Sequence, residues 1–345
     1  MDVMLKKNIN KKEKIFGLEI LRIYLSIIVV NTHCLNLSFS NNGLISSILV
    51  NRLHVPTFFI ISFYFFQKQI SKRNLDIFRQ RFKRLLIPYI VWPIIQWIIN
   101  NLLYHFLNNI TIKYSFKDLL IQLLTGHVFN PVLWFQWNLI FTTFLFILIE
   151  LISHKNILFF LLNIGLIAYF LQYSSISFNF FSKYNSKIKY TLGRCSEIMP
   201  SCISGFYLAY FKLIDFFTIN RIKTIYICLL VFSLIYKYNI IYSHLGFGYK
   251  GIKLNILSIC QFIIFLMVPN KFIPKIIKFI ITQISQFTPG IYYLHIPIYK
   301  YTRNSFILIN KRTIYGVIYI YIICYFICFI GNIIFKKSFL RNLFK

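Results

Sequence analysis

The sequence is poor in acidic side chains and, for its length, in charged side chains of either sign. Only 8 of its 345 residues are Asp or Glu, and charged residues make up 13% of the chain, against about 25% in an average soluble protein. Gly and Pro number 12 and 9, and no stretch rich in either could serve as a linker between domains. These shortages exclude an ordinary soluble domain and predict one folded unit.

Hydrophobic residues and basic residues are what the chain has in abundance. The hydrophobic share is 58%, and 38 Lys and Arg give a formal net charge of +30. A basic chain can bind nucleic acid, but here the Lys and Arg lie mostly in short connectors between apolar runs, as in a protein oriented in a lipid bilayer. We therefore expect no nucleic-acid partner and predict a multi-pass integral membrane protein.

The apolar runs predict an all-α fold, a membrane bundle of about ten transmembrane helices. A helix needs about 20 apolar residues to cross the hydrocarbon core. Ten segments approach that length: 15–36, 46–66, 85–104, 133–152, 157–173, 196–211, 224–243, 252–268, 280–299 and 313–335. The stretch 119–129 is too short to span, so we expect it to be interfacial or re-entrant.

The connector charges predict the orientation of this single domain. Connectors on the side of the N-terminus hold 23 Lys and Arg, and those on the opposite side hold 12. By the positive-inside rule both termini are cytoplasmic. We thus expect a basic cytoplasmic N-terminus (1–14), a helical bundle (15–335) and a basic cytoplasmic tail (336–345).

The seven cysteines do not predict a metal site. They lie almost wholly inside apolar segments, where Cys usually behaves as a small buried apolar residue. Cys324 and Cys328 are four residues apart on one predicted helix, but no His or second Cys pair accompanies them. We expect no metal.

The first apolar segment carries the ionisable residues that stand out. Ionisable groups at membrane depth are costly and are functional candidates. At about 100° per residue, Arg22 and His33 differ by only ~20° around the helix and lie about 16 Å apart along it. Glu19 and Ser26 share their face, and the Glu19–Arg22 spacing suits an ion pair. This polar stripe must face the bundle interior, either for function or simply to pin the helix to its neighbours.

These residues resemble the opening helix of the membrane-bound acyltransferase 3 family, the ten-helix O-acyltransferases of surface polysaccharides. That family typically shows Asp or Glu, then Arg, ten residues, and His. Further similar phrases follow in the family's order: VPTFFIISFYFF (55–66), RFKRLLIPYIVW (81–92), LWF (133–135), GFYL (205–208) and GIYYLHIPI (290–298). Two departures are Glu19, where Asp is commoner, and Phe63, where the family has Gly after Ser62.

The resemblance implies a function in the plasma (inner) membrane. It implies acetyl-CoA, or another acyl-CoA, as a co-substrate with no permanently bound cofactor, and a polysaccharide or lipid-linked glycan as acceptor. His33 would activate the acceptor hydroxyl or briefly carry the acyl group, with Arg22 held by Glu19. In the basic cytoplasmic loop, Arg81 and Arg84 would receive the CoA phosphates together with Arg22, although topology and anionic lipid headgroups also explain a basic loop.

Four further residues are candidates for substrate binding, each beside a structural alternative. Ser26 shares the polar face of the first segment, and Ser62 lies in the phrase 55–66. His295 lies between Pro289 and Pro297, where we expect the helix to bend, and packing could equally explain it. His54 lies near the outer end of its helix, where it could contact lipid headgroups instead.

The competing interpretation is a flippase or polymerase for lipid-linked oligosaccharides in the same envelope pathway. Such proteins also have many helices, few acidic residues and interior Arg, but their charge is normally spread over several helices. Some relatives append a soluble esterase-like domain. We expect no such domain here, because only ten residues follow the last predicted segment. The bundle would then complete the transfer alone or pass the acyl group to a separate envelope-synthesis partner protein.

Overall fold

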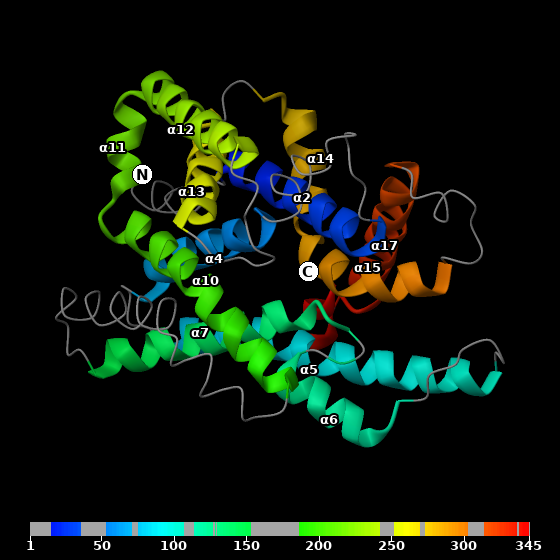
Figure 1. Ribbon diagram of the computed structural model, residues 1–345. Helices are drawn as coiled ribbons and strands as arrows, with labels where there is room; N and C mark the ends of the chain where they lie inside the picture. Colours follow the sequence, from blue (N-terminus) through cyan, green and yellow to red (C-terminus); the bar gives the residue numbers. More distant parts are fainter. Residues whose placement is uncertain are drawn as a thin grey trace, which may run out of the picture.

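The computed structural model describes the helical part of the chain (Figure 1). The described residues are 15–35, 53–70, 75–106, 114–126, 128, 130–152, 186–241, 252–269, 273–302, 314–336 and 338–344. Within them the regular structure is entirely helical, with 12 α-helices, one π-helical turn and one 3-10 turn. The all-α prediction is confirmed for this part of the chain.

The first half of the chain contributes five α-helices and the π-turn. They are α2 (Phe16–Val30), which continues into the π-turn η1 (Asn31–Leu35), then α4 (His54–Ile70), α5 (Leu75–Phe106), α6 (Phe116–Thr125) and α7 (Leu133–Ile152). The second half contributes α10 (Ser186–Tyr210), α11 (Leu213–Ile219), α12 (Arg221–Ile241), α13 (Ile252–Leu266), α14 (Lys275–Ser285), α15 (Thr288–Thr302), α17 (Ile314–Ile334) and the 3-10 turn η3 (Phe339–Leu343).

Four of these helices contain stretches long and apolar enough to cross a membrane. The stretches are Phe16–His33, Phe78–Leu102, Leu133–Glu150 and Tyr315–Ile334. They support a multi-pass membrane protein, whereas the count of ten spans and the orientation of the termini stay predictions. Of the other predicted segments, 157–173 and the first residues of 46–66 lie outside the described residues.

Two features of the chain differ from their predicted form. The basic connector after the second segment is largely helical, because α5 begins at Leu75 and includes Arg79, Arg81 and Arg84. The predicted bend of the ninth segment occurs earlier than Pro297, at Gln286–Phe287, where α14 ends and α15 begins. Pro289 lies in the first turn of α15, where a missing N–H costs no helical hydrogen bond.

The polar-stripe helix α2 occupies the centre of the bundle. It packs against α4, α13, α14, α15 and α17, and Figure 1 shows it crossing between α13 and α14. At Gly17 the backbones touch so closely that a Cβ would collide with the carbonyl of Phe265 on α13. Small residues allow this approach, which supplies packing energy that lipid tails cannot replace.

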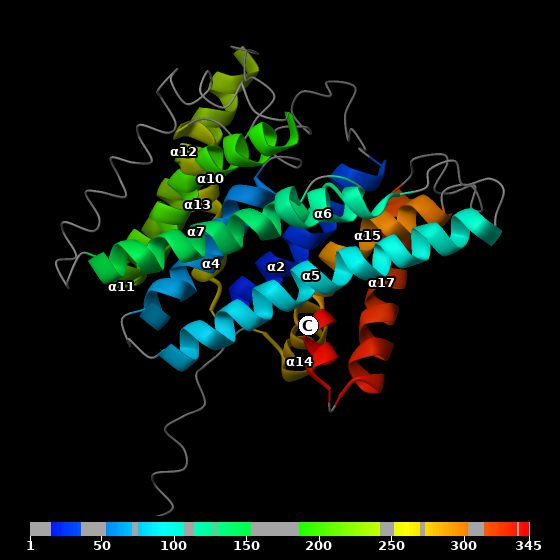
Figure 2. The same cartoon turned by 90° about the horizontal axis from the view of Figure 1, so that it is seen from below.

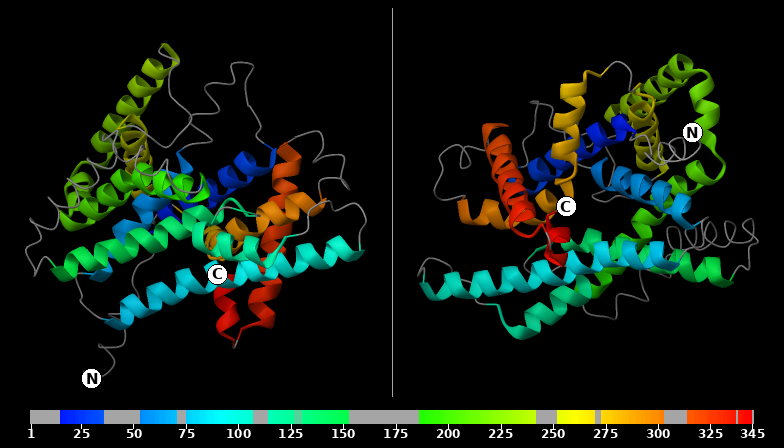
Figure 3. Two further views of the ribbon diagram at one scale, coloured as in Figure 1. Left: turned by 60° about the horizontal axis from the view of Figure 1, so that its bottom comes forward. Right: turned by 180° about the vertical axis from the view of Figure 1, so that it is seen from behind.

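Helices α4 and α10 form a similar close pair, and α5 and α7 run alongside each other (Figures 2 and 3). A Cβ on Gly205 of α10 would collide with the backbone of Ile60 on α4. The close approach in α4 is therefore at Ile60, one turn before Phe63, whose fully buried ring packs on Phe146 with centroids 4.7 Å apart. The bulky Phe63 is accommodated because the tight contact lies elsewhere.

The end of the chain folds back onto the bundle. The indole N–H of Trp92 donates to the carbonyl oxygen of Leu343 at 3.3 Å, and the ring of Phe344 stacks on Phe335 with centroids 5.7 Å apart. The Arg341 guanidinium donates to the Asn332 side chain at 3.0 Å. Residues 338–344 are thus fastened to α5 and α17.

Candidate functional site

The Glu19–Arg22 ion pair predicted from its spacing is present on α2. Nη1 of Arg22 lies 3.2 Å from Oε1 of Glu19, and the guanidinium lies over the Phe65 ring of α4, 5.7 Å from its centroid. A third of the Arg22 side chain remains exposed, against 16% for Glu19. The pair and the aromatic ring lower the cost of placing a guanidinium at this depth.

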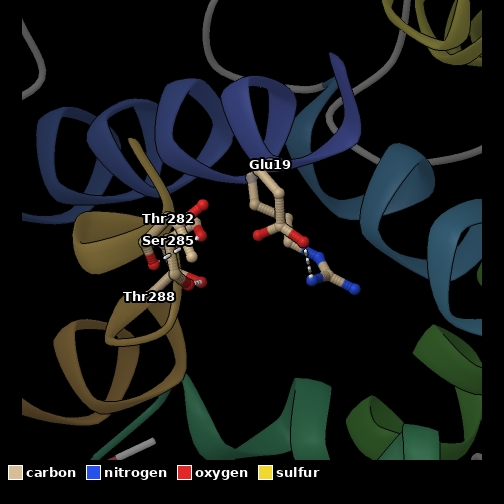
Figure 4. Close-up of polar contacts among 5 residues, drawn as sticks. Glu19, Thr282, Ser285 and Thr288 are labelled. Atoms are coloured by element: carbon tan, nitrogen blue, oxygen red, sulfur yellow. Dashed lines mark hydrogen bonds and ion pairs between the residues drawn. The ribbon is translucent and has the colours of Figure 1, made fainter. Parts of the chain in front are cut away.

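Glu19 faces a row of hydroxyl groups at the junction of α14 and α15 (Figure 4). The Ser285 hydroxyl donates to the carbonyl of Thr282 at 3.2 Å, and the Thr288 hydroxyl donates to the carbonyl of Ser285 at 2.9 Å. The Thr288 hydroxyl thereby satisfies the Ser285 carbonyl, which Pro289 cannot bond, whereas the Thr282 carbonyl also accepts the Gln286 N–H. The helix break therefore gives Glu19 a polar rather than a hydrocarbon neighbourhood.

Ser26 continues the stripe but is engaged in holding helices together. Its hydroxyl lies 2.7 Å from the carbonyl of Ile23 and 3.0 Å from the hydroxyl of Tyr321 on α17. The side chain is buried. This contact fixes α2 against α17, and the substrate-binding role of Ser26 stays a prediction.

Three predicted histidines from three different helices meet at the far end of α2. The rings of His33 and His295 have centroids 5.6 Å apart. His54 of α4 lies close enough to both rings to interact electrostatically with each. His54 and His295 are essentially unexposed, and His33 is half-buried. Within the described residues no set of three or more His, Cys, Asp or Glu has an arrangement that could hold a metal ion.

Local structure sets the orientation of two of these rings. His33 lies in the π-turn η1, and such turns inside helices are rare and frequent at functional sites. Nδ1 of His295 lies 3.2 Å from the carbonyl of Ile291, one turn earlier in α15. Tyr292 packs near the His295 ring at 6.0 Å, and its hydroxyl donates to the carbonyl of Val132 at 2.7 Å. The histidines therefore lie beside the start of α7.

Arg81 and Ser62, predicted for different roles, contact each other. Nη2 of Arg81 donates to the Ser62 hydroxyl at 2.9 Å and lies 3.5 Å from the Thr143 hydroxyl of α7. Its guanidinium lies 4.5 Å from the Phe66 centroid and 6.0 Å from that of Phe63. No carboxylate among the described residues pairs with Arg81, and its Nε is buried there without a hydrogen-bond partner.

Arg84 is exposed on the same helix, one turn from Arg81, and interacts with it electrostatically. Like charges so close repel unless an anion joins them. Arg22 and Arg81 in turn lie over adjacent rings of α4, Phe65 and Phe66. Arg22 and Arg81 thus lie at the same level of α4 but against different faces, because consecutive helical residues point about 100° apart.

Sequence reasoning missed several polar residues that line this region. Asn138, Thr142 and Thr143 of α7 are fully buried, and the Thr142 hydroxyl donates to the backbone carbonyl of Asn138 at 2.7 Å. Asn138 could have been selected from the sequence, because it is a polar residue within the strongly apolar run 133–152. The same criterion that selected Glu19 and His33, polarity at membrane depth, selects it too.

Comparison with known proteins agrees with the resemblance seen in the sequence. A family model described as an acyltransferase domain, that of the acyltransferase 3 family, matches residues 15–337, which is nearly the whole chain. The match includes every candidate residue described above. No curated protein and no solved structure gives a significant match.

Proposed function

The chain belongs to the acyltransferase 3 family, and we propose that it is a membrane O-acetyltransferase of the cell envelope. It would transfer an acetyl group from cytoplasmic acetyl-CoA to a hydroxyl of a cell-surface polysaccharide or its lipid-linked precursor. It would act as a multi-pass protein of the plasma membrane. The family membership and the apolar helices support a membrane acyltransferase; the donor, the acceptor and the membrane are the proposal.

The observation that carries the proposal is the separation of two kinds of group along α2. Arg22 lies in the N-terminal half of α2, over the Phe65 ring of α4, whose neighbour Phe66 packs on Arg81. At the C-terminal end of α2 the rings of His33 and His295 lie together, and His54 is near enough to interact with both electrostatically. In the predicted orientation the arginine end faces the cytoplasm, where an anionic acyl-CoA is found. The imidazole end faces the outer leaflet, where a glycan acceptor is presented.

The donor would be held through its phosphates. Arg binds phosphate oxygens through a planar fork of donors, and a partly buried guanidinium that pairs with no carboxylate is stabilised by a bound anion. Arg81 meets that description, Arg84 offers an exposed charge beside it, and Arg22 supplies a third. Ser62 orients the Arg81 fork in this arrangement, and its direct contact with substrate stays a prediction.

The reaction needs a base for the acceptor hydroxyl. In the direct route, His33 takes the hydroxyl proton while the oxygen attacks the thioester carbonyl. The C–O bond forms, the C–S bond breaks, and the CoA thiolate leaves and takes the proton from His33. In the second route a ring nitrogen of His33 attacks the thioester carbonyl, the C–S bond breaks, and CoA leaves as the thiolate, which takes the ring proton. The acceptor oxygen then attacks the acetyl carbon, the C–N bond to His33 breaks, and the hydroxyl proton passes to the imidazole that is released. His54 and His295, packed around His33, would position its ring and contact the acceptor.

The substitution His33→Ala tests the proposal directly. We expect transfer of label from acetyl-CoA to the membrane glycan fraction to fall by about 10²- to 10⁴-fold, the usual range for loss of a general base. Binding of acetyl-CoA should persist, because the arginines are unchanged. Equal protein levels in the membrane control for folding.

Two results would count against this function. Full transfer by His33→Ala would remove that residue from the mechanism. Wild-type protein that neither binds nor hydrolyses labelled acetyl-CoA would instead favour a flippase or polymerase, which has no use for a thioester.

A further inference from the structure

Asn138 is a buried polar side chain that the proposed mechanism does not use. It lies in the second turn of α7, with no exposed surface. Neither its Nδ2 nor its Oδ1 has a hydrogen-bond partner among the described residues. An amide left unpaired in this way destabilises the fold, so a group that pairs with it is to be expected.

Two polar residues follow Asn138 along α7: Thr142 lies about 40° from it around the helix and Thr143 about 140°. One turn further, the Thr142 hydroxyl donates to the backbone carbonyl of Asn138 at 2.7 Å. The next residue, Thr143, contacts the Arg81 guanidinium at 3.5 Å. Five residues separate Asn138 from Thr143, which corresponds to about 7.5 Å along the axis.

In the other direction α7 leads to the histidines. The ring of Phe135, one turn before Asn138, packs on Tyr292 with centroids 5.1 Å apart, and Tyr292 lies 6.0 Å from His295. Tyr292 also donates to the carbonyl of Val132. Asn138 therefore lies between the arginine that would bind phosphate and the imidazoles that would perform the transfer.

The chemistry of the donor fits this position. In an acyl-CoA the phosphates are joined to the thioester by the pantetheine arm, which contains two secondary amides. An Asn side chain offers both N–H donors and a carbonyl acceptor, and so complements an amide on both counts. A phosphate bound at Arg81 and a thioester at His33 would draw the arm past α7.

We propose that Asn138 binds an amide of the pantetheine arm and so determines the specificity for CoA thioesters. This inference rests on the proposed function, because it takes an acyl-CoA as the donor. It assigns to α7 a part in donor recognition that none of the predicted site residues provides.

The test compares acetyl-CoA binding by purified wild-type protein and by Asn138→Leu and Asn138→Ala. Leu keeps the approximate shape, and Ala removes the amide without filling its space. We expect both to raise the Kd about 10-fold, the effect of one lost hydrogen bond. The melting temperature of Asn138→Leu should not fall, because the substitution removes unpaired groups rather than a bond.

Asn255→Leu is the matched control. Asn255 donates to Ser204 at 2.9 Å and bonds with Ser201 at 3.0 Å, joining α13 to α10. Its replacement should lower the melting temperature and leave the acetyl-CoA Kd unchanged. Asn138 variants with a wild-type Kd would overturn the inference alone, as would a loss confined to acceptor use. Wild-type protein that does not bind acetyl-CoA would overturn the proposed function as well.

Discussion

At the scale of single residues, Arg81 is notable because no carboxylate among the described residues neutralises its charge. Its guanidinium contacts a hydroxyl and two aromatic rings, none of which neutralises its charge. A buried charge is normally paired, because removing it from water is expensive. Arg81 is partly buried and its Nε has no hydrogen-bond partner among the described residues, so a bound anion would stabilise it.

Replacing Arg81 by Lys tests this anion requirement. Lys keeps the charge but loses the planar fork and much of the stacking on Phe66. We expect the Kd for acetyl-CoA to rise at least 10-fold, measured with labelled ligand on purified protein. Arg79→Lys, an exposed position on the same helix, should change it less than twofold. Equal effects of the two substitutions would indicate a general electrostatic attraction instead of a defined phosphate site.

The residue scale also separates what the sequence predicts from what it leaves open. The Glu19–Arg22 pair follows from helical spacing alone and is present at 3.2 Å. The approach of His33 to His295 and His54 joins residues far apart in the chain. Helical periodicity contains no information about such tertiary contacts, so their convergence could not be predicted.

At the scale of elements, the short helix α6 is stabilised by capping and by side-chain hydrogen bonds. Its start has a capping box between Ser115 and Asp118, and it ends at Gly126, whose φ of 67° suits glycine. Behind it, the Gln122 side chain donates to the carbonyl of Asn130 and accepts from the backbone N–H groups of Val128 and Asn130. The helix and the following loop are thereby held beside α7.

The substitution Gln122→Ala should loosen this element. It leaves buried backbone groups unpaired, at a cost of about 1–3 kcal/mol, and the α6–α7 loop adjoins Tyr292 near the histidines. We expect a lower melting temperature in detergent and reduced acetyl transfer. Leu124→Ala, an exposed position on the same helix, should change neither by much. An unaltered melting temperature for Gln122→Ala would show that the bonds contribute little.

The elements predicted best are those whose apolar run has clear ends. Helices α7 and α17 begin and end within a residue or so of the predicted 133–152 and 313–335. The start of α5 and the break before α15 were predicted less well. Basic residues suggested a loop where they occupy a helix, and the bend depends on how α14 and α15 pack against α2.

At the scale of the whole molecule, the outer surface fits a hydrocarbon solvent. Large apolar side chains are exposed along the outward faces of α12 and α17, among them Ile222, Leu234, Ile322 and Phe326. In water such faces would associate, whereas in a bilayer they meet acyl chains. The cluster around Arg81 lies instead between α4, α5 and α7, and α17 packs on the π-turn that holds His33.

The direction of transfer depends on the orientation of this bundle in the membrane. The excess of Lys and Arg on one set of connectors predicts that both termini are cytoplasmic. A fluorescent protein fused to either end should therefore be fluorescent, and an alkaline phosphatase fused to either end should be inactive. With the termini inside, the arginine end of α2 is next to cytoplasmic acetyl-CoA and the histidines are next to the outer leaflet. Active phosphatase at both ends would reverse that assignment and leave Arg81 on the side that lacks the donor.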